Sequence, residues 1–131
     1  MIFVDTSAWF ASAVPSDADH AAASRWLAQN TYPLFTTDYI VDETLTLLKV
    51  RGQALRAMAL GEEFFQGNRA VLHFLTGDEI REAWEVFRKF KDKEWSFTDC
   101  TSKVVMEKSG MTTAFAFDHH FHQFGTAIVV P

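Results

Sequence analysis

Short apolar runs alternate along the chain with longer stretches in which apolar residues recur every three or four positions. The short runs predict β-strands, and the longer stretches predict helices with one apolar face. Strands are expected at residues 1–4, 34–36, 70–75, 113–117 and 127–130. Because strands and helices alternate, we expect an α/β fold of three layers, with a mostly parallel sheet covered by helices on both faces.

Capping residues indicate where several helices begin. Two capping boxes are present, in which Glu79 follows Thr76 and Asp99 follows Ser96 by three residues. Each predicts a helix start at that point. Helices are therefore expected at residues 6–14, 19–28, 38–52, 53–65, 77–90 and 97–110, with a short turn or helix at 119–124.

The composition indicates one folded domain spanning residues 1–131. Hydrophobic residues make up 48% of the chain and aromatic residues 15%, which excludes a disordered protein. No apolar run is long enough to span a bilayer, and no signal-peptide pattern opens the chain. Cys100 is the only cysteine, so no internal disulfide can form. We therefore expect a cytoplasmic protein in a reducing setting.

Acidic residues occupy positions where their charge needs compensation. Asp5 and Asp118 each follow an apolar run that is predicted to be a strand. Parallel strands place their carboxyl ends at one edge of the sheet, where ligands of such folds bind. If Glu43 and Asp99 also point to that edge, four carboxylates converge there. Such a cluster stays ionised around Mg²⁺ or Mn²⁺, and this arrangement suits the hydrolysis of phosphate esters.

Each of these acids also has a purely structural explanation. Asp5 can cap the helix that follows it, although Thr6 or Ser7 is the expected cap. Asp99 is explained by its capping box, and Asp118 can begin a turn. Helical periodicity leaves open whether Glu43 or the adjacent Asp42 faces the cluster.

Four segments together resemble the PIN-domain family, and in particular its VapC-like toxin ribonucleases. These segments read FVDTSAW, VDETLTLL, SFTDCTS and AFAFDHHFHQFG, and their order and spacing cover nearly the whole chain. The resemblance implies a PIN-like fold and a metal-dependent endoribonuclease that hydrolyses RNA. It also implies a homodimer and a small antitoxin protein that blocks the active site. The alternatives are a PIN nuclease of RNA processing without an antitoxin, and a non-catalytic RNA-binding domain.

The resemblance also assigns roles to residues of this chain. It places the family's four metal-binding and catalytic acids on Asp5, Glu43, Asp99 and Asp118, and so selects Glu43 over Asp42. Thr98 matches a hydroxyl residue that precedes the third acid, and Thr6 can serve similarly. Both are expected to position water or phosphate, and the implied cofactor is Mg²⁺ or Mn²⁺.

Other readings of the same residues are weaker. His120 and His122 have a zinc-like spacing, but nothing in the sequence completes a zinc site, so the histidines at 119, 120 and 122 are expected at the surface near the cleft. A phosphatase with an aspartyl nucleophile at Asp5 would need a second aspartate two residues later, but position 7 is Ser7, so this reading is set aside.

The net charge of −5 is weak evidence against RNA binding, because the proposed metal site would account for four of the 17 acids. Two groups of basic residues can line an RNA path or can be ordinary solvated faces. They are Lys49, Arg51, Arg56 and Arg69, and Arg81, Arg88, Lys89, Lys91 and Lys93.

Overall fold

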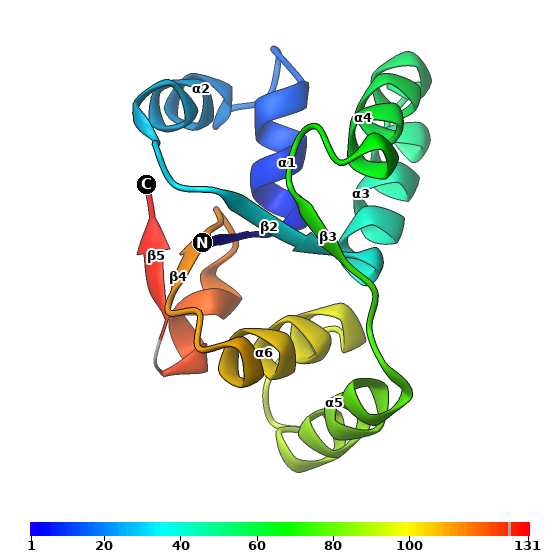
Figure 1. The fold of residues 1–131 in the computed structure, drawn as a ribbon, viewed down its shortest axis with the longest axis vertical. Coiled ribbons are helices and arrows are strands. Elements are labelled where there is room, and N and C mark those ends of the chain that lie inside the picture. Colours follow the sequence, from blue (N-terminus) through cyan, green and yellow to red (C-terminus); the bar gives the residue numbers. More distant parts are fainter. Residues whose placement is uncertain (126) are drawn as a thin grey trace.

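Five parallel strands form one central sheet in a computed structural model that describes residues 1–125 and 127–131. The strands lie in the order β3-β2-β1-β4-β5, and every neighbouring pair is parallel. Figure 1 shows the sheet between two layers of helices. The predicted three-layer α/β fold is therefore confirmed. The strands are β1 (Ile2–Val4), β2 (Leu34–Thr37), β3 (Val71–His73), β4 (Thr113–Phe115) and β5 (Ile128–Val130).

The helices divide between the two faces according to their place in the chain. The helices before β3 cover one face, and those after β3 cover the other (Figure 1). The first group is α1 (Thr6–Ala13), α2 (His20–Gln29), α3 (Asp38–Val50) and α4 (Ala54–Gln66). The second is α5 (Gly77–Lys89), α6 (Phe97–Ser109) and the 3₁₀ helix η1 (His119–Phe124).

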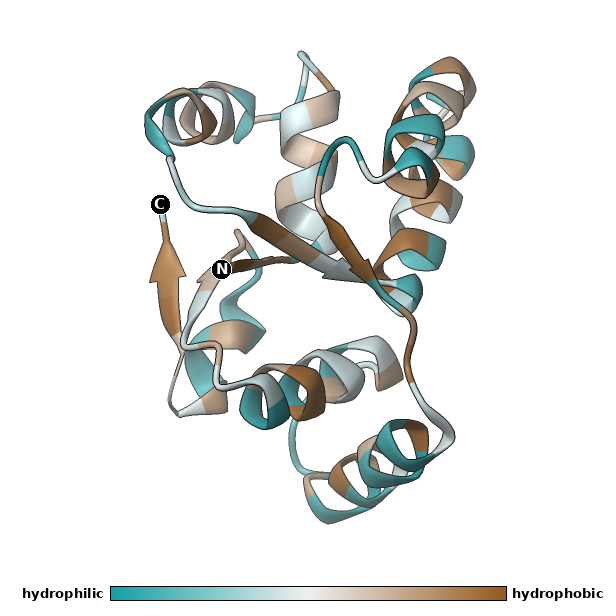
Figure 2. Ribbon diagram, viewed as in Figure 1, coloured by the Kyte–Doolittle hydropathy of each residue, from teal (hydrophilic) through white to brown (hydrophobic). Residues whose placement is uncertain are grey.

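The hydrophobic core lies on both sides of the two central strands. Phe3 and Val4 of β1, and Ala114 and Phe115 of β4, are buried almost completely. Figure 2 shows the strands as largely hydrophobic, whereas the helices carry both hydrophobic and hydrophilic residues. This is the expected pattern for a parallel sheet covered on both faces, since its central strands have no solvent-facing side.

The chain reverses its direction of winding between β1 and β4. It moves outward from β1 through β2 to β3, and then crosses to β4 on the other side of β1. In open α/β sheets a crevice forms at such a switch point, beyond the carboxyl ends of the two strands. Asp5 follows β1 directly, and Asp118 follows β4 by three residues. The topology therefore places both acids beside the expected ligand-binding crevice.

The strands β3 and β4 each end two residues earlier than predicted, because side chains take backbone donors that would extend them. The Leu75 N–H donates to Asp38 Oδ1 (3.0 Å), so β3 stops at His73 rather than residue 75. The Phe117 N–H donates to the Ser7 hydroxyl (2.9 Å), and β4 stops at Phe115.

The helix starts bear out the capping analysis at three places and correct it at one. Thr37 caps α3, and both capping boxes are formed, at Thr76 for α5 and at Ser96 for α6. The expected cap of α1 was wrong, because Asp5 itself is the N-cap, in place of Thr6 or Ser7. None of the helices in the described ranges is both long and apolar enough to cross a membrane.

Candidate active site

Asp5 is buried at the end of β1, and one of its two carboxylate oxygens is held by Ser7. Oδ2 accepts the backbone N–H of Ser7 (3.2 Å) and the Ser7 hydroxyl (2.6 Å). Oδ1 accepts no hydrogen bond from the described residues, and among these residues no fully buried side-chain oxygen or nitrogen lacks a partner. Oδ1 therefore reaches solvent, so the carboxylate is fixed on one side and free on the other.

Asp99 lies in the first turn of α6 and repeats this arrangement. Its Oδ2 accepts the Ser96 N–H of the capping box (3.0 Å) and lies 3.0 Å from Nδ1 of His120. Within the described chain Oδ1 has no protein donor, and by the same reasoning it is open to solvent. The capping explanation of Asp99 is thus correct, and it leaves one oxygen available for a ligand.

Glu43 is the acid of α3 that turns toward the site. Its side chain is partly buried, whereas Asp42 is exposed. Burial raises the pKa of Glu43, and a hydrogen bond with the neighbouring Thr6 hydroxyl lowers it by a smaller amount. The buried Thr44 hydroxyl in turn donates to Thr6 Oγ1 (3.2 Å), which links α3 to α1 beside the acid.

Asp118 caps η1 and is more exposed than Asp5 and Asp99, with 33% of its side chain accessible. Its Oδ1 accepts the backbone N–H of His120 (2.9 Å) and lies 3.2 Å from the Nδ1 atom of that residue. His119 Nδ1 is 3.7 Å from the same oxygen. One histidine, His120, therefore contacts both Asp99 and Asp118.

The charges of the four carboxylates act on one another, which places them around a common space. Burial, together with the charges of Asp99 and Glu43, raises the pKa of Asp5 from 3.8 to about 7, although the Ser7 hydrogen bonds oppose this. Burial and the charges of Asp99 and Asp118 likewise raise the pKa of Glu43. The pKa of Asp99 is raised by burial and by Asp118, against the Ser96 and His120 hydrogen bonds. Such a group is relieved by a cation.

Two surface cavities flank this acidic cluster (Asp5, Glu43, Asp99 and Asp118) and share Leu47. One, of about 350 Å³, is lined by Glu43 and Thr98 among others. The other, of about 600 Å³, is lined by residues that include Arg51, Asp118 and His120.

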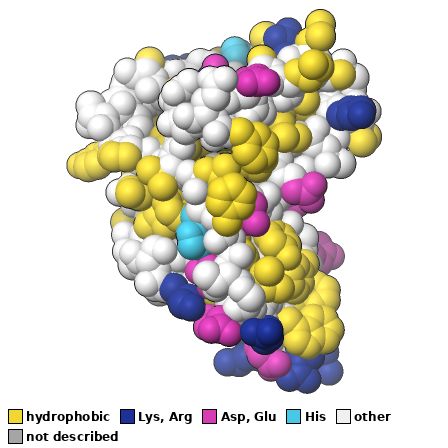
Figure 3. Space-filling model, turned by 45° about the vertical axis from the view of Figure 1, so that its right-hand side comes forward, with side chains coloured by type: hydrophobic (Ala, Val, Ile, Leu, Met, Phe, Trp, Pro, Cys, Tyr) yellow, Lys and Arg dark blue, Asp and Glu magenta, His cyan; other side chains and the backbone are white. Residues whose placement is uncertain are grey.

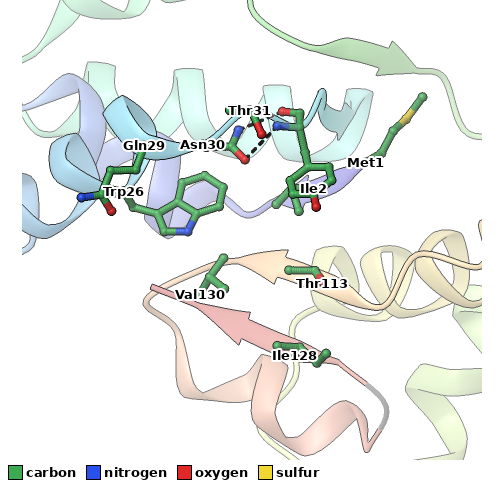
Figure 4. A pocket seen from close by; sticks show the side chains of 10 residues that line it. Met1, Ile2, Trp26, Gln29, Asn30, Thr31, Thr113, Ile128 and Val130 are labelled. Atoms are coloured by element: carbon green, nitrogen blue, oxygen red, sulfur yellow. Dashed lines mark hydrogen bonds between the residues drawn. The ribbon is translucent and has the colours of Figure 1, made fainter.

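A third cavity, of about 550 Å³, lies between α2 and the strands β1, β4 and β5. Figure 4 shows Trp26 and Ile2 pointing into it, with Thr113 and Ile128 on the opposite wall. None of the four acids lines this cavity.

Sequence reasoning missed two residues that hold the cluster. Ser7 was read as a helix cap, but its hydroxyl connects Asp5 to the Phe117 backbone ahead of Asp118. His120 was expected at the surface with its neighbours. His119 and His122 are indeed exposed, but only 15% of the His120 side chain is accessible. The available signal was its position two residues after an N-cap aspartate, where the backbone turns back on the cap.

The chain matches a family model described as "PIN domain" over residues 2–126. The chain belongs to the PIN-domain family. A PIN-domain relative, the 23S rRNA-specific endonuclease VapC20 of Mycobacterium tuberculosis, is 37% identical over 131 residues, which cover 100% of this chain and 99% of that protein. The VapC ribonuclease of Archaeoglobus fulgidus is 40% identical over 92 residues, covering 68% of this chain and 53% of its own length.

Two solved structures share the fold of this chain. The crystal structure of Mycobacterium tuberculosis VapC20, described as a sarcin-ricin loop cleaving toxin, superposes with a TM-score of 0.93 at 35% identity, and each chain is covered completely. FitAcB from Neisseria gonorrhoeae superposes with a TM-score of 0.67 at 15% identity, covering 100% of this chain and 97% of that one. The second likeness concerns the fold alone.

Proposed function

We propose that this protein is a metal-dependent endoribonuclease that hydrolyses phosphodiester bonds of RNA, as the toxin of a toxin–antitoxin pair. The observation that carries the proposal is the convergence of Asp5, Glu43, Asp99 and Asp118 at the switch point of the sheet. Membership of the PIN-domain family and full-length similarity to an rRNA endonuclease support the same activity. The relative's 23S rRNA is accordingly the first substrate to test.

The donor set of the acidic cluster fits Mg²⁺ or Mn²⁺. All four groups are hard carboxylate oxygen donors, and Asp5 and Asp99 each keep one oxygen free of protein hydrogen bonds. A bound divalent cation supplies activation of water and neutralisation of the phosphate charge. The chain's own part is to fix the carboxylates, through Ser7, Ser96 and the helix caps.

Access for RNA is supported by the position of one basic residue. Arg51, at the end of α3, is the one Lys or Arg among the described residues that line the two cavities beside the acidic cluster. It also lies over the Phe10 ring, 5.9 Å from the ring centroid. By contrast, Arg69, Arg81 and Arg88 form ion pairs with nearby glutamate or aspartate side chains. We therefore assign the phosphate contact to Arg51.

An exposed aromatic row supports the proposed protein partners. The rings of Trp84, Phe87, Phe97 and Tyr39 follow one another at centroid distances of 6.0 Å. Hydrophobic side chains gather over α5 at the lower right of Figure 3, and Trp84 and Phe87 are among the exposed ones. The row runs from α5 toward Asp99 and Glu43, so a bound antitoxin could extend along it into the active site. A homodimer is proposed for the same reason, since surfaces of this kind are typical of interfaces.

The proposed activity is tested by RNA cleavage with purified protein. Wild-type protein is incubated with 23S rRNA and Mg²⁺ or Mn²⁺, with and without EDTA, beside Asp5→Asn and Asp99→Asn. Cleavage should require the cation and should be lost in both variants. Cleavage that is indifferent to EDTA, or unchanged in both variants, would contradict the mechanism.

The partner proposal has a separate test. If a small protein is encoded directly upstream, expressing it together with this chain should relieve growth arrest and should block cleavage in vitro. The mass of the purified protein in solution tests the homodimer.

A further inference from the structure

His120 occupies a central place in the acidic cluster and has no role in the proposed function so far. It follows Asp118 by two residues, in η1, and its ring packs beside Asp99 of α6. Its Nδ1 atom lies 3.0 Å from Asp99 Oδ2 and 3.2 Å from Asp118 Oδ1. Two acids that come from separate elements, and that repel each other, are thus joined by one nitrogen atom.

The chemistry of these contacts fixes the role of the nitrogen. Both neighbours are carboxylate oxygens, which accept hydrogen bonds and do not donate them while ionised. Nδ1 must therefore carry the hydrogen, which it donates to Asp99 Oδ2, while Asp118 Oδ1 accepts the backbone N–H of His120 and lies 3.2 Å from Nδ1. Among the described residues Nε2 has no protein partner and is not sealed from solvent, so nothing in the fold competes for the ring from its other side.

The fold contains a second histidine–carboxylate pair against which His120 can be compared. His73 Nε2 lies 2.9 Å from Glu79 Oε1, and Glu79 is also the acid of a capping box. That pair joins one histidine, on the edge strand β3, to one acid, on α5. His120 differs because it reaches two acids, both of which belong to the proposed metal site.

We propose that His120 is a positioning residue that sets the orientation of Asp99 for metal binding through its Nδ1–H hydrogen bond and keeps Asp118 beside the same nitrogen atom. The proposal rests on the proposed function. The oxygen atoms that His120 does not contact, Asp99 Oδ1 and Asp118 Oδ2, would be the ones available to hold the cation. The competing arrangement is direct ligation, because Asp118, His119 and His120 offer ligand atoms that all lie within 4.8 Å of one another.

Substitutions at position 120 separate the two arrangements. His120→Asn can place an amide N–H where Nδ1 lies, whereas His120→Gln places its amide near the Nε2 position and leaves the Nδ1 position empty. His120→Ala removes both. His119→Ala and His73→Ala are the controls, since the first leaves the hydrogen bond from His120 to Asp99 intact and the second removes the comparable pair at Glu79.

The measurement is the affinity for Mn²⁺ by calorimetry at pH 8, with circular dichroism as a check on folding. We expect His120→Ala and His120→Gln to bind Mn²⁺ about 10- to 100-fold more weakly, as for other residues that orient metal-binding side chains. His120→Asn should recover most of this loss, and both controls should bind like the wild type. Wild-type affinity in His120→Ala would overturn the proposal. Failure of His120→Asn to recover binding, together with weak binding by His119→Ala, would assign direct ligation instead and also overturn it.

A second readout depends on neither metal nor RNA. In the metal-free protein, long-range ¹H–¹⁵N correlation spectra should show His120 with its proton on Nδ1, and a proton on Nε2 alone would contradict the hydrogen bond from Nδ1 to Asp99. If the wild type binds Mn²⁺ but does not cleave RNA, the proposed function fails while these two measurements still decide the role of His120.

Discussion

The two capping boxes of this protein have nearly the same local geometry and opposite electrostatic surroundings. In α5 the side chain of Glu79 accepts the Thr76 N–H at 2.9 Å, and in α6 that of Asp99 accepts the Ser96 N–H at 3.0 Å. Both acids have 6% residue exposure, and both contact a histidine. Position in a helix cap therefore does not distinguish them.

The neighbouring charges do distinguish the two acids. Burial alone would raise the pKa of Glu79, but the Thr76 hydrogen bond and His73 outweigh it, so the pKa lies below its usual value. Burial also raises the pKa of Asp99, and the charge of Asp118 raises it further. The pKa therefore stays above its usual value, although hydrogen bonds with Ser96 and His120 lower it. The protein partners of Glu79 in the α5 box favour its charged form, whereas the surroundings of Asp99 in the α6 box do not. Under the proposed function, this difference separates a structural acid from a metal-binding one.

The largest expected difference between the two boxes concerns cleavage of RNA. Asp99→Asn should reduce kcat/KM by roughly 10²- to 10³-fold, because a metal-binding carboxylate contributes several kcal/mol to transition-state stabilisation. Glu79→Gln should stay within about threefold of the wild type, since it lies outside the acidic cluster. Steady-state cleavage of a short RNA with Mn²⁺ measures both. Equal losses in the two variants would remove the distinction between the boxes.

Stability without metal should change in the opposite direction. With EDTA at pH 8, Asp5→Asn should raise the free energy of unfolding by about 1–3 kcal/mol, because it removes a buried charge that faces Asp99 and Glu43. Asparagine also remains a good N-cap for α1. Glu79→Gln should lower the same quantity by about 1–2 kcal/mol, since charge-assisted hydrogen bonds are lost. Urea unfolding measures the free energy of unfolding of both variants. Destabilisation by Asp5→Asn would show that the buried charge of Asp5 does not lower the stability of the folded protein.

The pH dependence of stability sharpens the same contrast. The folded-state pKa of Asp5, about 7, is above its ordinary 3.8, so the folded protein holds this proton more tightly. Its contribution to stability is full at low pH and is lost as the pH rises from about 4 to about 7, by at most about 1.4 kcal/mol per pH unit. The lowered pKa of Glu79 has the opposite sign, so its contribution is present above pH 4.5 and is lost as the pH falls.

Unfolding curves in EDTA from pH 4 to pH 8 should therefore lose stability less steeply in Asp5→Asn than in the wild type. Glu79→Gln should keep the wild-type slope between pH 5 and pH 8. Identical slopes in the wild type and Asp5→Asn would contradict the raised pKa of Asp5.

The smallest expected effect is at Arg51. Arg51→Ala should raise KM for RNA by about 3- to 10-fold and should weaken the dependence of cleavage on salt, as for loss of one phosphate contact. The effect is modest because Asp17, Asp19 and Glu94 line the same cavity. Arg88→Ala is the matched control, since Arg88 pairs with Glu85 on α5. A larger change in KM for Arg88→Ala than for Arg51→Ala would indicate that RNA contacts α5 rather than Arg51.

Much of the fold could be predicted from local pattern, because apolar runs, caps and glycine-terminated helices are short-range signals. The strand limits were less accurate, since they depend on side chains that are distant in sequence. The Phe117 N–H finds Ser7, 110 residues away, and the Leu75 N–H finds Asp38. No local pattern contains these bonds.

The candidate site shows the same limit. Strand ends and family resemblance indicated the four acids. Periodicity alone left Glu43 and Asp42 unresolved, the resemblance selected Glu43, and Asp42 is exposed in the structure. The partly buried position of His120 depends on η1 packing against α6, which a run of three nearby histidines does not reveal.

The account's central claim is that the acidic cluster is a divalent-cation site, and a calorimetric titration with Mn²⁺ at pH 8 tests it most directly. Wild-type protein and Glu79→Gln should bind Mn²⁺ with similar affinity, and Asp99→Asn should bind at least about tenfold more weakly. Absence of binding in the wild type, or equal binding by Asp99→Asn and the wild type, would contradict the claim.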